Sequence, residues 1–576
     1  MPTHGRERAV IKLLCVWSLG AFAATFGLSA PGNDAGSPTN SAERPLRPDY
    51  LSREPAKVFE LPAIAPYVAD PSAIQNSGTR RFKSTVFKGN TVFATSIVEA
   101  IAKPFLERDL GPSDLEELRQ KLTRYYVDRG FINSGAILAV DPLDDDVLVC
   151  SIVEGRLTAI RIRGLEWLHE DYVADRLGRA ADGPLNVDKL RERFQLLLSD
   201  PLFARMNSRL MPGDRLGESV LDVDIVRALP YQLSLYGNNY RPPSIGADGL
   251  GLGGWVRNLT GRGDLLEASV EDSRRFDSGL RTSLAWRLPI GNFGTELIMK
   301  YDRGRSSVVE EPLARLGIAS ILQSGDIGIS QVLIETLADK VTIGLNHIDR
   351  ENRTWLLGIP FSFVPGEPDG VTRASGWRFW QEATHRSERD VLALRSIFSF
   401  VRNNLQDIPD LPASAQVGPD HHYWFWLGQA QYARQIFDSR AQFIVRGTLQ
   451  RTTARMLTLD GLPIGGVNTV RGYRENQLIR DNALTGSVEM DYPLALDALE
   501  TVKVSLVPFY DFGQGKNKNM DSAFLSSCGL AVRARWQGIT AYLALAKRLA
   551  HSDSVTIGHG TLQDKGAHFS LTYDFF

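Results

Sequence analysis

Cysteine is scarce in this chain, whose 576 residues include only Cys15, Cys150 and Cys528. Because Cys15 falls in the N-terminal segment and the other two lie far apart, neither a disulfide framework nor a cysteine-based metal site is expected. Basic residues are not in excess either, since 65 Lys and Arg against 67 Asp and Glu give a net charge of −2. This balance argues against a nucleic-acid partner.

Long apolar runs are also missing once the N-terminus is passed, so transmembrane helices are not expected there. The N-terminus itself has basic residues followed by the apolar stretch Leu13–Ala30, with small residues near its end. This order is typical of a signal peptide and predicts that residues 1–30 direct export. Residues 31–79 are rich in Pro, Ser, Ala and Asn, and we interpret them as a linker that has room for a plug element.

An internal repeat follows the linker. Gly89 and Gly164 each end a first strand, and Ser113 and Asn186 each begin a second helix, so the offsets are 164 − 89 = 75 and 186 − 113 = 73 residues. Two agreeing offsets indicate a duplicated β-α-α-β-β unit. The predicted α+β domains are residues 80–154 and 155–228.

The second helix of each copy has a recognisable start. Ser113, with Glu116 three residues later, predicts a capping box. In the second copy, Asn186 is the predicted N-cap of a helix whose apolar residues recur at helical spacing. Each helix could therefore bury one face on a small sheet.

From residue 229 onward, short stretches alternate between two faces. In one example Leu284, Trp286 and Leu288 alternate with Ala285 and Arg287. The segment has 576 − 228 = 348 residues, too many for one β-sandwich, and arginine recurs on one face, as it does where strands line a water-filled lumen. We predict that residues 229–576 form a transmembrane antiparallel β-barrel of about sixteen strands in a bacterial outer membrane. The aromatic residues predicted to form its membrane girdle include Tyr423, Trp424, Trp426 and Tyr573.

Two short motifs stand out inside the predicted barrel. The first is Val470, Arg471, Gly472 and Tyr473, and the second places Phe509, Asp511 and Gly513 at alternate positions of a strand. An arginine at the tip of a glycine-rich loop can enter the lumen, and an aspartate on an inward strand position can pair with it. Either motif alone is a weak signal, because an Arg-Gly-Tyr sequence usually marks only a turn.

Together and in this order, the motifs carry a family resemblance. The chain resembles the Omp85 superfamily, and within it the outer-membrane transporters of two-partner secretion (TpsB type, ShlB/FhaC/HecB), over nearly everything after residue 80. The segments 126–131, 153–157, 198–201, 210–213, 238–240 and 261–264 also carry it. The resemblance implies that the two repeats are periplasmic POTRA domains. It further implies that the loop carrying Val470–Tyr473 folds into the lumen and that Arg471 contacts Asp511.

The resemblance implies a pore that secretes a partner exoprotein of hemolysin, adhesin or toxin type from periplasm to cell surface (type Vb secretion). The exoprotein would arrive unfolded through the POTRA domains. We expect no enzyme activity, cofactor, metal or nucleic-acid partner. We do expect contact with outer-membrane lipid and a monomeric chain, with a weak dimer as the alternative. Competing hypotheses are an outer-membrane assembly factor of the same superfamily, a passive porin or ligand-gated receptor, and a soluble binding protein. Assembly factors typically carry more than two POTRA domains.

Overall fold

The computed structural model describes residues 79–106, 108–140, 146–178, 183–274, 276, 278–291, 293–407, 418–436, 441–494, 501–518, 520–550 and 560–575. The predicted signal peptide and all but the last residue of the predicted linker, with its plug element, lie outside these residues. The chain forms two compact units, one built on the strands from Tyr231 onward and the other on the α/β segments before them. Among the described residues, no helix is both long and apolar enough to cross a membrane.

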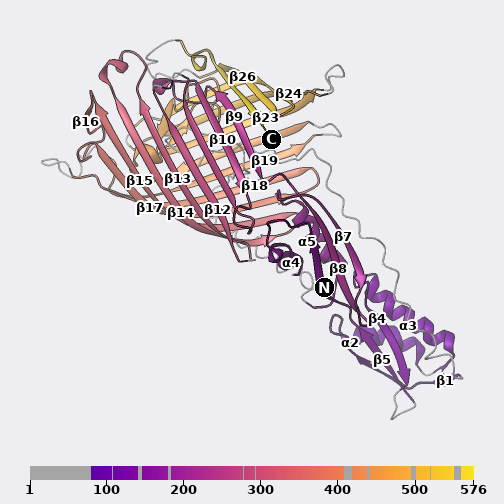
Figure 1. The fold of residues 1–576 in the computed structure, drawn as a ribbon. Helices are drawn as coiled ribbons and strands as arrows, with labels where there is room; N and C mark the ends of the chain where they lie inside the picture. The colour runs from indigo at the N-terminus through magenta and orange to yellow at the C-terminus, as the bar shows by residue number, and fades with distance from the viewer. Residues whose placement is uncertain are drawn as a thin grey trace. The chain divides into compact units, whose positions relative to one another are not determined.

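The first copy of the repeat folds as predicted around a three-stranded sheet of order β2-β5-β4, of which β4 and β5 are labelled in Figure 1. Its main elements are β2 (Ser84–Lys88), α2 (Thr95–Ala102), α3 (Pro112–Val127), β4 (Gly135–Val140) and β5 (Val147–Val153). Three short elements complete it: η2 (Lys103–Phe105) and the pair β1 (Arg80–Arg81) and β3 (Asp109–Leu110). Leu118, Leu122 and Tyr126 of α3 are fully buried in its core, because they lie on one face at helical spacing.

The start of α3 differs from the prediction. The helix begins at Pro112 with Gly111 as N-cap, and the carboxylate of Asp114 accepts a hydrogen bond from Gly111 N at 2.9 Å. The predicted Ser113–Glu116 capping box is therefore wrong. Proline is favoured at the first helical position, since its φ suits the helix and its missing N–H would have no intrahelical partner. Glu116 instead pairs with Arg119 at 2.6 Å, and hydrogen bonds from that guanidinium hold the pKa of Glu116 below its usual range.

The second copy repeats the topology, with strand order β6-β8-β7. Its elements are β6 (Arg156–Arg163), α4 (Glu170–Gly178), α5 (Val187–Leu198), β7 (Phe203–Pro212) and β8 (Glu218–Arg227). The side chain of Asn186 accepts hydrogen bonds from the backbone N of Asp188 (3.0 Å) and Lys189 (3.2 Å), so the predicted N-cap is confirmed. In both copies the first strand is parallel to the last strand, which occupies the centre of the sheet.

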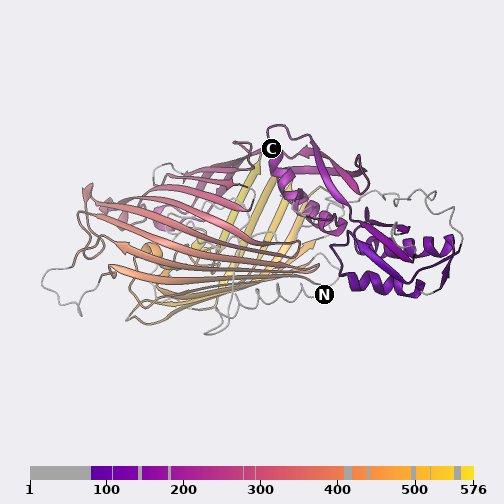
Figure 2. The same cartoon turned by 90° about the horizontal axis from the view of Figure 1, so that it is seen from below.

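The remaining strands close into one antiparallel barrel, seen from two directions in Figures 1 and 2. They are β9 (Tyr231–Asn238), β10 (Gly249–Arg257), β11 (Leu265–Ser273), β12 (Arg281–Ile290), β13 (Thr295–Ser307), β14 (Ala319–Glu335), β15 (Asp339–Leu356), β16 (Ile359–Pro360), β17 (Val371–Arg386), β18 (Asp390–Asn403), β19 (His422–Gln435), β20 (Gln442–Arg451), β23 (Asn482–Leu494), β24 (Lys503–Lys516), β25 (Ala523–Trp536), β26 (Ile539–Arg548) and β27 (Ala567–Asp574). β16 has two residues and pairs only with the end of β15, which pairs directly with β17, so 17 − 1 = 16 strands form the ring. Pairing of β27 with β9 closes it. The predicted sixteen-stranded barrel is confirmed.

The two faces of each strand alternate as predicted. Leu284 on β12 is 48% exposed on the outer face, whereas Arg281 of the same strand is 7% exposed on the lumen side. Among the predicted girdle residues, Trp424 and Tyr573 are exposed on the outside, but Tyr423 is 6% exposed and faces the lumen. The assignment of Tyr423 to the girdle is therefore wrong, because successive residues of a strand point to opposite faces.

The connections at the two ends of the barrel differ in length. At one end the strands are joined by short turns, such as 336–338 and 387–389, and the chain enters the barrel at this end. Long connections, including 404–421 and 452–481, join the strands at the other end. In outer-membrane barrels the short turns face the periplasm and the long loops face the outside.

Candidate functional site

The predicted arginine motif lies in the long connection between β20 and β23, which we call the lumen loop (residues 452–481). The loop contains η6 (Thr458–Asp460) and a small antiparallel pair, β21 (Leu462–Ile464) with β22 (Leu478–Arg480). Val470–Tyr473 lies between these two strands, and all four residues are buried. The loop is thus folded back against the barrel wall, because its tip contacts inward-facing side chains of β23, β24, β26 and β27 and a backbone carbonyl of β25.

Arg471 and Asp511 are in direct contact. Arg471 Nε donates to Asp511 Oδ2 and Arg471 Nη2 donates to Asp511 Oδ1, both at 2.7 Å, in a bidentate pair. The backbone N of Arg471 adds a third bond to the same carboxylate at 3.0 Å. The Arg471 side chain is 0% exposed and that of Asp511 is 1% exposed, so the pair is removed from water. A desolvated bidentate pair is much more directional than an exposed one.

A second carboxylate completes the charge balance around Arg471. Glu489 on β23 accepts from Arg471 Nη2 at 2.7 Å and pairs with Arg446 on β20 at 2.9 Å. Ser487 donates to Asp511 at 2.7 Å. The sequence reasoning missed Glu489 and Ser487. Strand alternation could have identified them, because they occupy lumen-facing positions two residues apart.

The strand motif shapes the surface that receives the loop. The ring of Phe509 lies 3.4 Å from the guanidinium carbon of Arg471 and forms a cation–π contact with it. At Gly513 a Cβ atom would lie 2.4 Å from Ile464 and 3.0 Å from Val470, both in the loop. Glycine at this position therefore allows the loop to pack directly on β24.

The rest of the motif is held by β25, β26 and β27 and the segments beside them. The backbone N of Gly472 donates to His568 Nε2 at 3.0 Å, and its carbonyl oxygen accepts from Arg548 Nε at 2.6 Å. Tyr473 donates its hydroxyl to the carbonyl oxygens of Ser526 (3.1 Å) and Ala550 (2.6 Å). Arg471, Gly472 and Tyr473 are thus each fixed by hydrogen bonds of their own.

A second anchor lies near the start of the loop. Asp460 is fully buried, and its carboxylate pairs with Arg350 on β15 at 2.6 Å. It also accepts from the hydroxyl of Tyr423 on β19 at 2.6 Å. This explains why Tyr423 faces inward. The two anchors use different strands of the barrel wall, so together they fix the first part of the lumen loop and its tip.

The contacts of this site serve to position the lumen loop. The described residues contain no group of three or more His, Cys, Asp or Glu that could hold a metal ion. The buried groups of the two anchors are ion pairs and hydrogen bonds between the loop and the wall. Such contacts can hold a loop in one position or release it.

A closed outer-membrane barrel with an internal loop, preceded by two α/β repeats, is the architecture of an Omp85-type outer-membrane transporter. Residues 217–536 match the family described as "Haemolysin secretion/activation protein ShlB/FhaC/HecB", and residues 81–155 match "POTRA domain, ShlB-type". The first match covers more than half of the chain. The chain belongs to the ShlB/FhaC/HecB family.

Similar proteins agree with this assignment. "Outer membrane transporter CdiB" of Escherichia coli is 23% identical over 504 residues, covering 83% of this chain and 79% of the relative. "Heme/hemopexin transporter protein HuxB" of Haemophilus influenzae (strain 86-028NP) is 23% identical over 252 residues, covering 42% and 43%.

Solved structures show the same fold. CdiB from Escherichia coli superposes with a TM-score of 0.66 at 20% identity, covering 89% of this chain and 94% of that one. CdiB from Acinetobacter baumannii gives 0.58 at 16% identity, with coverages of 90% and 95%.

The chain is therefore an outer-membrane transporter of two-partner secretion, which moves a partner exoprotein from the periplasm to the cell surface. Its family is one of transporters and not of enzymes. This assignment decides against the porin, the soluble binding protein and the assembly factor.

Proposed function

We propose that the lumen loop closes the transport path at rest and that Arg471 is the residue that holds it there. The bidentate contact of a fully buried arginine with Asp511 is the observation that carries this proposal. Removing one partner of a buried ion pair leaves a buried charge uncompensated, which strongly disfavours that arrangement. The loop therefore has one preferred resting position, from which it must shift when the exoprotein passes.

We also propose that residues 80–154 and 155–228 act as two POTRA domains that capture the exoprotein while it is unfolded. Each has its own apolar core and a three-stranded sheet with edge strands. Among the described residues, β7 (Phe203–Pro212) pairs only with β8 and leaves its other edge open to pairing. An extended segment of the exoprotein can add to such an edge through backbone hydrogen bonds.

The proposed cargo is an exoprotein of hemolysin, adhesin or toxin type, whose folding outside the cell supplies the driving force. A monomer is the proposed working unit. Supporting this, the barrel completes its own hydrogen bonding, since β27 pairs with β9 over Ser570–Asp574. No second chain is needed to cover a strand edge of the ring.

The test of the loop's role is secretion by an Arg471→Ala variant. We expect secretion to fall at least about tenfold, because a loop without its buried ion pair is no longer held in the position from which transport starts, while the amount of folded protein in the outer membrane stays near wild type. Arg533→Ala is the matched control. Arg533 pairs at 2.7 Å with Asp491, a residue of the barrel wall rather than of the loop. Wild-type secretion by Arg471→Ala would refute the proposal.

A further inference from the structure

The outer face of the barrel carries an aromatic row toward the end with the long loops. Trp377 on β17 lies opposite Phe400 on β18, which lies opposite Trp424 on β19. These side chains are 52%, 55% and 47% exposed, so they face out of the barrel. His347 on β15 extends the row, with its ring 4.8 Å from that of Trp377. Outward aromatic rows mark the membrane interface of such barrels.

Polar groups replace the aromatic rings two residues farther along each strand. Asp349, Ser375, Arg402 and His422 lie opposite one another across β15, β17, β18 and β19. At a rise of about 3.3 Å per residue, this polar row is about 7 Å beyond the aromatic row. It therefore lies at the level of lipid headgroups in the outer leaflet.

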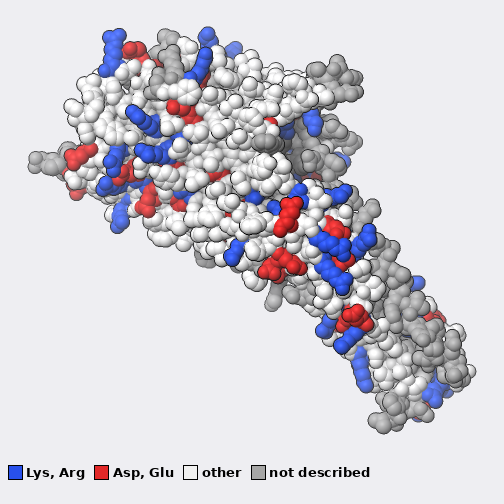
Figure 3. All heavy atoms as spheres, viewed as in Figure 1, with Lys and Arg blue, Asp and Glu red and all other residues white. Residues whose placement is uncertain are grey.

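Arginine dominates this outer region. Arg353 and Arg373 both bind Glu351, at 2.6 and 2.7 Å, and their side chains remain 53% and 63% exposed. Arg402 is exposed, and in the described part of the chain it has no ion-pair partner. Figure 3 shows blue basic side chains, with some red ones among them, gathered over the part of the barrel near β16.

We define the outer arginine patch as Arg353, Arg373 and Arg402 with the carboxylates of Asp349 and Glu351, so its formal charge is 3 − 2 = +1. The carboxylate of Glu351 lies between two guanidinium groups and orients both of them. Arg353 and Arg373 are therefore outward-facing donors that a shared carboxylate holds in place.

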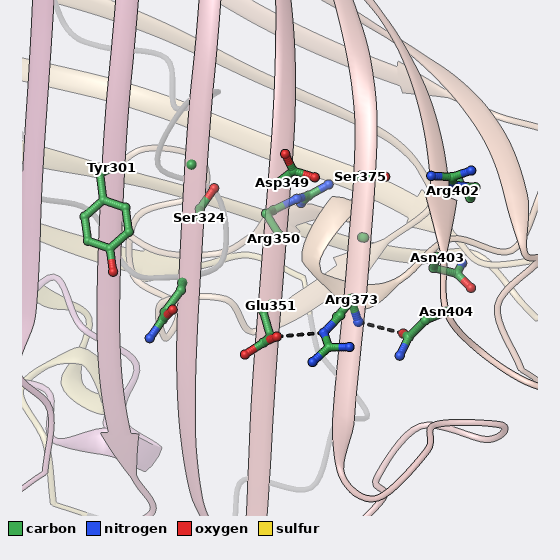
Figure 4. Close-up of a pocket in the computed structure, with 13 residues that line it drawn as sticks. Tyr301, Ser324, Asp349, Arg350, Glu351, Arg373, Ser375, Arg402, Asn403 and Asn404 are labelled. Atoms are coloured by element: carbon green, nitrogen blue, oxygen red, sulfur yellow. Dashed lines mark hydrogen bonds and ion pairs between the residues drawn. The ribbon is translucent and has the colours of Figure 1, made fainter.

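Four members of the patch, all but Arg353, border a hollow in the outer face (Figure 4). A groove of about 480 Å³ is bordered by Tyr301, Asp349, Glu351, Arg373 and Arg402. A second hollow of about 550 Å³ adjoins it, sharing Ser375 and Arg402, and is bordered by the rings of the aromatic row. Two arginines and two carboxylates of the patch border the first hollow, and aromatic rings border its neighbour toward the middle of the membrane.

We propose that the outer arginine patch binds a phosphorylated glycolipid of the outer leaflet. The phosphates would lie on the arginines and the acyl chains against the aromatic row. Planar guanidinium groups match phosphate oxygens in bidentate fashion. The adjoining aromatic hollow favours a lipid over a free phosphate, since only a lipid has an apolar part to place there. The position of both hollows on the membrane-facing side of a transporter fits the same occupant.

Native mass spectrometry of the purified full chain in detergent tests this, with lipid A carrying two phosphates as probe and dephosphorylated lipid A as reference. Wild type should retain the phosphorylated form in preference. The triple variant Arg353→Gln/Arg373→Gln/Arg402→Gln should retain about tenfold less of it, since charge-assisted hydrogen bonds are lost. Heat-shift mobility on gels checks that each variant is folded.

The matched control is Arg434→Gln compared with Arg402→Gln. Arg434 also faces outward, is 59% exposed, and lies at the opposite end of β19 beside Asp390. Arg434→Gln should retain the lipid as wild type does, while Arg402→Gln should not. Equal retention by wild type and the triple variant would overturn the proposal. Displacement of the lipid by an equal concentration of inorganic phosphate would do the same.

Discussion

Replacing Asp511 by asparagine removes one charge from the buried network around Arg471 and almost no volume. Two bonds of the bidentate pair, both 2.7 Å, lose their charged acceptor. The Asn oxygen can still accept one of them. Arg471 and Arg446 then face a single remaining carboxylate, Glu489, which already contacts both.

The cost of this substitution follows from the burial of the pair. Removing one partner of a buried ion pair costs about 3–5 kcal/mol when nothing else compensates the remaining charge. Because Glu489 compensates part of it, we expect about 2–3 kcal/mol for the resting position of the lumen loop. At about 1.4 kcal/mol for each factor of ten, the displaced loop should become about 30- to 140-fold more populated.

Conductance through single barrels in planar lipid bilayers measures this population, because a displaced loop opens the lumen. Asp511→Asn should raise the open fraction strongly. Asp326→Asn is the control, since Asp326 on β14 accepts a bond from the wall residue Asn346 at 2.6 Å. An open fraction for Asp511→Asn equal to that of the wild type, with folded protein confirmed by heat-shift mobility, would refute the reasoning.

Two further predictions concern other buried groups. Asp460→Asn should also raise the open fraction, because it weakens the 2.6 Å pair with Arg350. When it is combined with Asp511→Asn, the two effects should add in free energy, as expected of separate sites. A double variant that is no more open than either single variant would contradict this. Burial raises the pKa of the Cys150 thiol to about 12, so maleimide should label it at neutral pH only after unfolding. Since the unfolded thiol has a pKa of about 8.5, the folded state binds the proton more tightly, and the first α/β repeat should lose stability as pH rises from about 8.5 toward 12. Rapid labelling of Cys150 in the folded chain, or a denaturation midpoint constant over this pH range, would count against it.

Local sequence pattern was sufficient for the strands and for the repeat. Side chains alternate between the faces of a pleated strand, so Leu284 outside and Arg281 inside followed from their positions. Asn186 was found as a helix cap because its side chain bonds to backbone groups two and three residues later. In both cases the interaction that decides the structure lies within a few residues of the signal.

Local reasoning failed where neighbouring signals competed. Ser113 and Glu116 fit a capping box, but Pro112 one residue earlier set the helix start. Tyr423 was grouped with adjacent aromatic residues as girdle, although strand geometry allows only every second residue to face the lipid. The alternation of inward and outward residues around Tyr423 follows from the sequence, and the prediction did not apply it.

The sequence by itself determined a barrel preceded by a duplicated α/β unit, because periodicity and repetition are properties of short segments. It carried the pairing of Arg471 with Asp511 only through family resemblance. The tertiary structure alone decided that Arg471 pairs with Glu489 as well as with Asp511, and that Asp460 pairs with Arg350. These contacts depend on the register of strands and on the path of the lumen loop back to the wall. They join residues up to 110 positions apart, and no local spacing specifies them.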